Sequence, residues 1–180
     1  FIFAIITIWV YYFFRDPERK IIDDENYIVS PADGIISGIK EINGPVELGL
    51  ENTKYTRVSI FMNIFNCHVN RAPVSGEIDD IFYKPGKFLN ASLDKASDEN
   101  ERNYFKLKGV KASEPIVVVQ IAGLIARRIV TQVTKKESVK QGQRIGIIRF
   151  GSRVDVYYTQ KKTLVKVGQN VIAGESLIAG

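Results

Sequence analysis

The chain has 180 residues, a length that suits one globular domain with a substantial buried core. Its formal net charge of +5 comes from scattered lysines and arginines, which fit an anionic membrane surface or an acidic ligand better than nucleic acid. No nucleic-acid-binding motif is present, so we expect no such partner. One cysteine and one histidine exclude an internal disulfide and predict no metal site.

The N-terminal segment, residues 1–14, is uncharged and reads FIFAIITIWVYYFF. It is shorter than the roughly 20 residues that cross a bilayer. Three interpretations compete: a truncated transmembrane or membrane-dipping segment, a buried core element, and a signal peptide. Trp9, Tyr11 and Tyr12 precede Arg15 as in an interfacial aromatic belt, whereas no small-residue cleavage site follows. We therefore predict a membrane-associating segment.

Beyond Pro17 the pattern is mainly β, with short β-branched or alternating apolar runs separated by turn residues. Residues 86–104 are polar and predict a loop or a short helix. Residues 124–133 are compatible with either a continued strand or a short helix. The segments predicted to hold strands are residues 27–39, 56–65, 73–83 and 116–123.

Two segments, residues 139–146 and 165–175, share the pattern Val-Lys-x-Gly-Gln-x-Ile/Val. Such turns between short strands resemble the hammerhead turns of barrel-sandwich hybrid domains of the lipoyl and biotinyl type. We therefore expect a mainly β fold with a barrel-sandwich-hybrid-like core, which speaks to fold and not to function. Residues 94–96 imitate a lipoyl-attachment tripeptide, but they lie in a polar run, so we expect no lipoylation.

The dipeptide Gly151-Ser152 separates two β-prone runs, residues 145–150 and 154–158. In such a place Gly-Ser usually forms a turn or a bulge. A distorted Gly-Ser bond can also cleave itself, because the serine hydroxyl can attack the preceding carbonyl. Cleavage needs a base for the hydroxyl proton and donors for the oxyanion. Glycine suits the distorted position, since it tolerates unusual backbone angles.

Three other residues could support such chemistry. His68 is the only histidine, and its ordinary pKa lies near neutrality, so structural and catalytic roles both stay open. Asp33, in Asp-Gly before a predicted strand, either closes a turn or orients a catalytic group as the acid of a triad does. Cys67 is expected to be a small core residue.

Several arginines are candidates for binding phosphate or carboxylate, which guanidinium groups grip in a bidentate manner. Each is equally compatible with a solvated surface position. The candidates are Arg71, Arg127, Arg128, Arg149 and Arg153.

Six motifs in order carry a resemblance to a known family. With them the chain resembles the short form of the phosphatidylserine decarboxylase family over almost its whole length. The motifs are FFRDP at 13–17, SPADG at 30–34, NCHVNRAP at 66–73, NERN at 100–103, QIAGLIARR at 120–128 and RFGSR at 149–153.

The resemblance implies that the catalytic domain, residues 15–180, cleaves itself between Gly151 and Ser152. A β subunit would span residues 1–151 and an α subunit residues 152–180, with any further dimerisation left open. Ser152 would become a pyruvoyl cofactor that forms a Schiff base with phosphatidylserine and acts as electron sink for its decarboxylation to phosphatidylethanolamine. Asp33 would be the acidic helper of Ser152 and His68 the base or proton donor.

The resemblance also implies a membrane partner and a place at the cytoplasmic face of the cell membrane. The sequence departs from long-form relatives in one respect: they carry two histidines around this turn, and here only His68 is present, with Arg71 before the proline. Arg153 also stands where long forms have threonine. Two alternatives remain open, an archaetidylserine decarboxylase with the same chemistry and a non-catalytic membrane-anchored carrier or adaptor.

Overall fold

In the computed structural model, residues 1–88, 99–123, 128–149 and 152–180 are described. These parts hold an N-terminal α-helix, a short 3-10 helix and β-strands. The elements are α1 (Ile2–Phe13), β1 (Ile28–Val29), β2 (Gly34–Asn43), η1 (Val46–Leu48), β3 (Lys54–Met62), β4 (Val69–Arg71), β5 (Gly76–Lys84), β6 (Arg102–Gly109), β7 (Ile116–Ala122), β8 (Arg128–Thr131), β9 (Ser138–Val139), β10 (Arg144–Arg149), β11 (Ser152–Tyr158), β12 (Asn170–Val171) and β13 (Leu177–Ala179).

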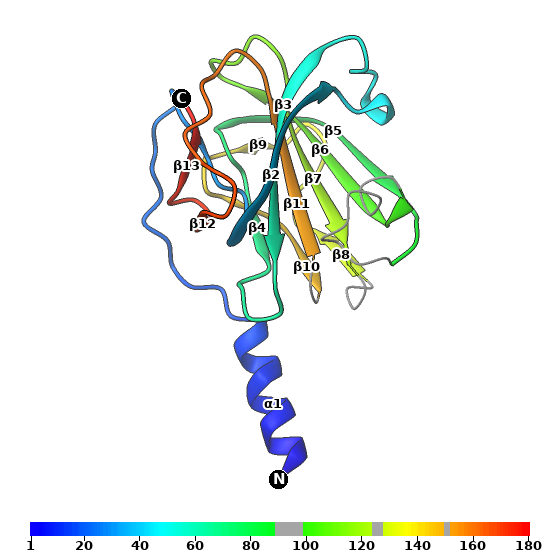
Figure 1. The fold of residues 1–180 in the computed structure, drawn as a ribbon, viewed down its shortest axis with the longest axis vertical. Coiled ribbons are helices and arrows are strands. Elements are labelled where there is room, and N and C mark those ends of the chain that lie inside the picture. The colour runs from blue at the N-terminus through cyan, green and yellow to red at the C-terminus, as the bar shows by residue number, and fades with distance from the viewer. Residues whose placement is uncertain (89–98, 124–127, 150–151) are drawn as a thin grey trace.

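The strands form one large curled sheet and two small ones (Figure 1). The large sheet has eight strands in the order β12-β2-β3-β11-β7-β6-β5-β9 and curves into a half-barrel. The small sheets are β4-β10-β8 and β1-β13. The prediction of a mainly β fold is therefore confirmed.

The main core lies between the inner face of the large sheet and the two small sheets. Val154 and Val156 of β11 are fully buried in it, together with Ile148 of β10 and Ile178 of β13. On the opposite face of the large sheet a smaller cluster includes Tyr157. Strand β11 is consequently buried on both faces, and every residue of it is buried. Its β-branched residues suit such a position.

The strands predicted around residues 56–65, 73–83 and 116–123 are present as β3, β5 and β7. The prediction for residues 86–104 was wrong at its end, because residues 102–104 begin strand β6. Their polar side chains are buried against distant partners: Arg102 lies 3.9 Å from Glu47, and Asn103 donates to Gln120. For residues 124–133, the described part contains strand β8.

The two repeated segments form the same turn, as their shared pattern predicts. Gly142 and Gly168 both adopt positive φ angles, 78° and 88°. In each turn the glutamine side chain that follows accepts a hydrogen bond from a lysine backbone N–H, at 3.0 Å in the first turn and 3.1 Å in the second. Glycine is required because other residues adopt this conformation at a cost in energy.

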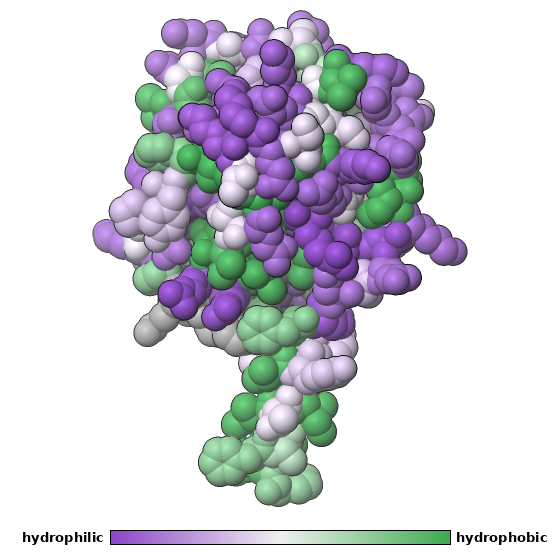
Figure 2. Space-filling model, turned by 180° about the vertical axis from the view of Figure 1, so that it is seen from behind, coloured by the Kyte–Doolittle hydropathy of each residue, from purple (hydrophilic) through white to green (hydrophobic). Residues whose placement is uncertain are grey.

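Helix α1 projects from one end of the half-barrel and is exposed and apolar around most of its circumference (Figures 1 and 2). Only Phe13, at its C-terminal end, is buried. No helix in the described ranges is both long enough and apolar enough to cross a bilayer.

Candidate active site

Ser152 is the first residue of β11, between β3 and β7, and lies directly opposite Met62 and Ala122. Residues paired in this way project from the same face of a sheet, so the three side chains share the inner, apolar face. Ser152 is fully buried, and its hydroxyl has no hydrogen-bond partner among the described residues. An unsatisfied buried hydroxyl destabilises a fold by about 1–3 kcal/mol, so its presence calls for a functional explanation.

His68 immediately precedes strand β4, which pairs with β10. Its carbonyl accepts a hydrogen bond from Ile148 N at 3.3 Å, which places His68 beside the strand that leads toward Ser152. The imidazole Nδ1 lies 2.9 Å from the carbonyl oxygen of Asn66. Because a carbonyl only accepts, Nδ1 carries the proton and Nε2 carries the lone pair. His68 is therefore presented as a base.

The environment keeps His68 neutral at physiological pH. Burial lowers its pKa to about 4, and the positive charge of Arg15 acts in the same direction. The hydrogen bond to Asn66 and the negative charge of Asp33 oppose this shift without cancelling it. The Phe13 ring packs on the imidazole with 4.4 Å between centroids, so α1 ends on the site.

The depressed pKa of His68 predicts acid sensitivity of the fold. The unfolded chain binds a proton at His68 below its ordinary pKa of 6.5, whereas the folded chain does so only near 4, so stability is lost as pH falls through this interval. From these pKa values, we expect the free energy of unfolding to fall by about 2 kcal/mol between pH 7 and pH 5. Urea unfolding at both pH values measures the loss. A His68→Gln variant serves as control and should lose about 2 kcal/mol less over the same interval.

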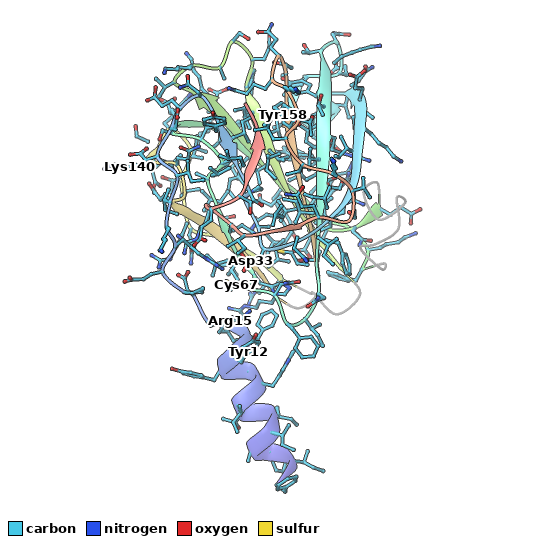
Figure 3. The ribbon with its side chains drawn as sticks, turned by 60° about the vertical axis from the view of Figure 1, so that its left-hand side comes forward. Tyr12, Arg15, Asp33, Cys67, Lys140 and Tyr158 are labelled. Atoms are coloured by element: carbon cyan, nitrogen blue, oxygen red, sulfur yellow. The ribbon has the colours of Figure 1, made fainter. Side chains whose placement is uncertain are left out.

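Asp33 lies near enough to His68 to act on it through its charge, but its hydrogen bonds go elsewhere. Its carboxylate accepts from the Arg19 guanidinium at 2.7 Å and from the backbone N–H of Ala173 at 2.8 Å. Figure 3 shows Asp33 above Cys67 and Arg15 at the junction with α1. The predicted triad acid is therefore close to His68, and its hydrogen bonds join the linker after α1 to a residue of the predicted α subunit.

The candidate arginines divide into two groups. Arg71 is buried and donates to Asp16 at 2.7 Å and to the Gly142 carbonyl at 3.0 Å, so its guanidinium holds the linker that follows α1. Arg149 and Arg128 lie opposite each other on β10 and β8, at the end of the sheet next to Ser152. This pair concentrates positive charge there and fits a phosphate ligand. The role of each in substrate binding stays a prediction.

Two parts of the prediction fall outside the described residues: Gly151, the carbonyl side of the expected cleavage bond, and Arg127. Arg153, the fifth arginine candidate, is buried and forms an ion pair with Asp155 at 2.9 Å. Cys67 is buried as expected, its Sγ donates to the Arg15 carbonyl at 3.3 Å, and burial raises its thiol pKa.

Sequence reasoning missed a buried amide network beside Ser152. Gln120 Nε2 donates to Asn70 Oδ1 at 2.8 Å, and Asn70 Nδ2 lies 3.8 Å from the sulfur of Met62, the residue opposite Ser152. Asn103 Nδ2 in turn donates to Gln120 Oε1 at 3.3 Å. A thioether is a weak acceptor, so the Asn70 amide keeps donor capacity on the face where Ser152 lies. Only the position of Asn70, two residues after the lone histidine, could have pointed to it.

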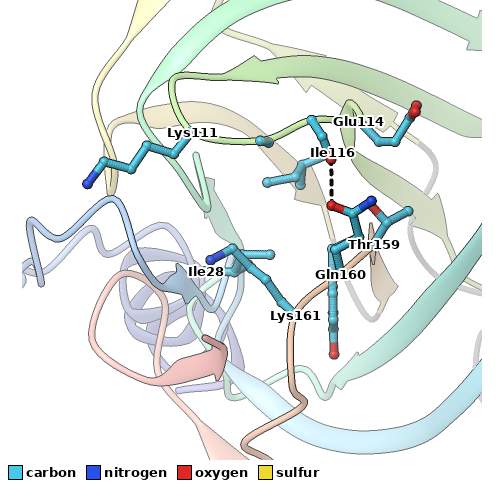
Figure 4. Close-up of a pocket in the computed structure, with 10 residues that line it drawn as sticks. Ile28, Lys111, Glu114, Ile116, Thr159, Gln160 and Lys161 are labelled. Atoms are coloured by element: carbon cyan, nitrogen blue, oxygen red, sulfur yellow. Dashed lines mark hydrogen bonds between the residues drawn. The ribbon is translucent and has the colours of Figure 1, made fainter.

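A cavity of about 170 Å³ lies between Lys111, Lys161 and Tyr158 (Figure 4). Ser113 donates to Gln160 across it at 2.8 Å. Tyr158 is the last residue of β11 and Ser152 the first, so the strand separates the cavity from Ser152 by about 20 Å. The cavity is therefore separate from the candidate active site.

Comparisons with known proteins point to one family. The family model described as phosphatidylserine decarboxylase matches residues 6–179. A phosphatidylserine decarboxylase proenzyme of Pelagibacter ubique is 63% identical over 97% of this chain and 81% of the relative. Those of Ruegeria pomeroyi and Rickettsia typhi are 53% and 55% identical over 97% of this chain, and over 80% and 76% of the relatives.

Proposed function

The chain belongs to the phosphatidylserine decarboxylase family and is a self-processing decarboxylase of phosphatidylserine, and we propose that Ser152 is both its cleavage nucleophile and the source of a pyruvoyl cofactor. The observation that carries this proposal is the fully buried Ser152 hydroxyl, which has no hydrogen-bond partner in the described parts of the chain. The neutral His68, whose backbone is hydrogen-bonded to β10 just before Ser152 in the chain, would supply the base that such a hydroxyl needs.

Maturation begins when Ser152 Oγ attacks the Gly151 carbonyl while His68 Nε2 takes the hydroxyl proton. The Gly151–Ser152 C–N bond then breaks and the amine of residue 152 receives a proton, which leaves an ester between the Gly151 carboxyl and Ser152 Oγ. Loss of the Ser152 α-proton and departure of the Gly151 carboxylate give a dehydroalanine, which water converts to pyruvoyl with release of ammonia. An amide donor such as Asn70 suits the oxyanion of the first step.

The surroundings of Ser152 fit a pyruvoyl group. Met62 and Ala122 flank it on the inner face and are fully buried, so they would shield a ketone from water. When present, the group supplies an electron-withdrawing carbonyl that takes up the electron pair released as CO2 leaves. The apolar walls favour departure of the carboxylate, because no ion pair stabilises it in the ground state.

Other residues would bind and protonate the substrate. Arg128 and Arg149 would hold the lipid phosphate at the open end of β8 and β10. His68 would protonate the carbon that has lost CO2, since its backbone is hydrogen-bonded to β10, the strand that leads to Ser152. The family relatives are named for phosphatidylserine, which favours this lipid over archaetidylserine.

We further propose that α1 holds the enzyme at the cytoplasmic face of the cell membrane. Support comes from its apolar and exposed surface and from the lipid nature of the substrate. A helix of this kind meets the lipid at or within the interface, which is where the substrate headgroup is found.

The proposed cofactor is tested by the mass and reactivity of the small fragment. We expect the active enzyme to yield a fragment of residues 152–180 whose N-terminus resists Edman degradation and reacts with phenylhydrazine. Intact-mass spectrometry of both fragments gives the cleavage position. A single uncut chain of 20.3 kDa in fully active enzyme would refute self-cleavage.

We expect the two fragments to stay together after cleavage without a covalent bond. The α subunit would supply β11, which is hydrogen-bonded to β3 and β7 of the β subunit along its length. On its outer face Arg153 and Asp155 form a buried ion pair, and Arg57 of β3 lies 3.9 Å from Asp155. Size-exclusion chromatography should show co-elution in native buffer and separation only in denaturant. Release of the small fragment under native conditions would contradict this prediction.

A further inference from the structure

In the loop between β3 and β4, residues 63–66 are fixed directly to the C-terminal end of α1. The Arg15 guanidinium donates to the Phe65 carbonyl at 2.7 Å and to the Tyr12 carbonyl at 2.9 Å. Within the loop, Phe65 N donates to Asn63 Oδ1 at 2.8 Å and Asn63 N donates to Asn66 Oδ1 at 2.9 Å. The loop and the helix end therefore form one hydrogen-bonded unit.

The Phe65 side chain is 60% exposed although its backbone is held in place on both sides. Other exposed aromatic residues surround the end of the helix, namely Tyr11, Tyr12 and Phe14. We call these three residues and Phe65 the aromatic collar. An exposed group of large apolar side chains on an ordered surface marks an interaction site.

Positive charge accompanies the aromatic collar. The Arg15 guanidinium lies 3.8 Å from the centre of the Tyr12 ring, and that of Arg149 lies 5.8 Å from the centre of the Phe14 ring. Aromatic rings mixed with arginines are typical of the bilayer interface, where the rings reach the acyl boundary and the cations meet lipid phosphates. A protein partner is less suited to this arrangement, because the collar continues into the apolar surface of α1.

We propose that Phe65 is a second membrane contact, which inserts into the interface of a phospholipid bilayer beside α1. This inference rests on the proposed membrane attachment and specifies how the catalytic domain sits on it. Phe65 precedes His68 by three residues, and Asn66 between them accepts the His68 Nδ1–H. Phe65 therefore fixes the orientation of the domain so that the His68 end of the half-barrel faces the lipid headgroups.

A tryptophan at position 65 tests the insertion. The chain has one tryptophan, so Trp9→Phe with Phe65→Trp places a single fluorophore on the loop. With vesicles of phosphatidylcholine and phosphatidylglycerol, we expect a blue shift and stronger quenching by lipids brominated near the headgroup than by lipids brominated near the chain ends. The matched control, Val46→Trp in the Trp9→Phe background, labels η1 at the end of the half-barrel away from α1 and should not respond (Figure 1).

Two outcomes would overturn the inference. In the first, the protein still binds vesicles, but they change the emission of the tryptophan at position 65 no more than that of the control. In the second, the emission shifts to the blue in the absence of lipid as the protein concentration rises, which would indicate contact with a second copy of the chain. Self-cleavage and product formation are measured on the same preparations. Their loss would count against the proposed function, whereas their retention with an unresponsive fluorophore would refute this inference alone.

A kinetic experiment tests the same contact by another route. The quantity measured is the ratio between turnover of phosphatidylserine in vesicles and turnover of a monomeric short-chain phosphatidylserine. Phe65→Ser should lower this ratio by about tenfold, which is the effect of removing one phenylalanine from an apolar environment. Val46→Ser is the control and should leave the ratio unchanged. An unchanged ratio for Phe65→Ser would contradict the proposal.

Discussion

Replacing Ser152 with alanine is expected to leave one uncut chain with decarboxylase activity reduced by at least about 10⁴-fold, because both the nucleophile and the precursor of the cofactor are lost. The stability of the fold should not decrease. The Ser152 hydroxyl is buried and has no hydrogen-bond partner in the described residues, so its removal leaves no other group unsatisfied. We expect the free energy of unfolding to stay equal or to rise by about 1 kcal/mol. Intact-mass spectrometry, product assay and urea unfolding measure the three effects.

The matched control is Ser59→Ala. Ser59 is also buried, lies on neighbouring strand β3 and pairs with Asp155 of β11. The backbone carbonyl of Ser59 accepts a hydrogen bond from the Ser37 hydroxyl, and the alanine variant keeps this carbonyl. This variant should cleave itself and retain activity. Cleavage in Ser152→Ala would place the scissile bond elsewhere and refute the assignment.

Much of the fold follows from local pattern. The β-branched run of residues 116–122 forms a fully buried strand, and the shared Val-Lys-x-Gly-Gln pattern produces the same turn twice, because in each case glycine supplies the positive φ. The start of β6 escaped prediction, since Arg102 and Asn103 are polar and yet buried. Their burial depends on Glu47 and Gln120, which are distant in sequence and invisible to any local window.

The site was predictable to a similar degree. Ser152 and His68 stand out in the sequence as a Gly-Ser between strands and the only histidine. The structure buries both, and the His68 backbone is hydrogen-bonded to β10, the strand that precedes Ser152 in the chain. The partners of Asp33 and Arg71 could not be foreseen. They bind Arg19 and Asp16 in the linker after α1, and such pairings arise only when the linker folds back across the domain. For the same reason the packing of Phe13 on His68 had no signal in the sequence.

The second large effect is expected at His68. His68→Ala should slow self-cleavage by about 10²- to 10⁴-fold, the usual contribution of a general base. Cys67→Ala is the matched control, because Cys67 is the buried neighbour whose thiol bonds to a backbone carbonyl, and it should cleave within about threefold of the unaltered rate. The precursor is made by cell-free synthesis and transferred to fresh buffer. Gel electrophoresis and mass spectrometry then follow its cleavage over time and give the rates. Equal rates for His68→Ala and the unaltered chain would remove His68 from the mechanism.

The pH profile separates a basic role of His68 from a structural one. With its pKa lowered to about 4 by burial, the imidazole is neutral and able to accept the Ser152 proton from pH 5 upward, so the rate should be flat between pH 5 and pH 8. Below pH 4 protonation removes the lone pair, and the rate should fall about tenfold per pH unit. Circular dichroism at each pH distinguishes this decline from unfolding. A midpoint near 6.5 in folded protein would mean that His68 is not buried as described when cleavage occurs. A profile retained in His68→Gln would assign the titration to another group.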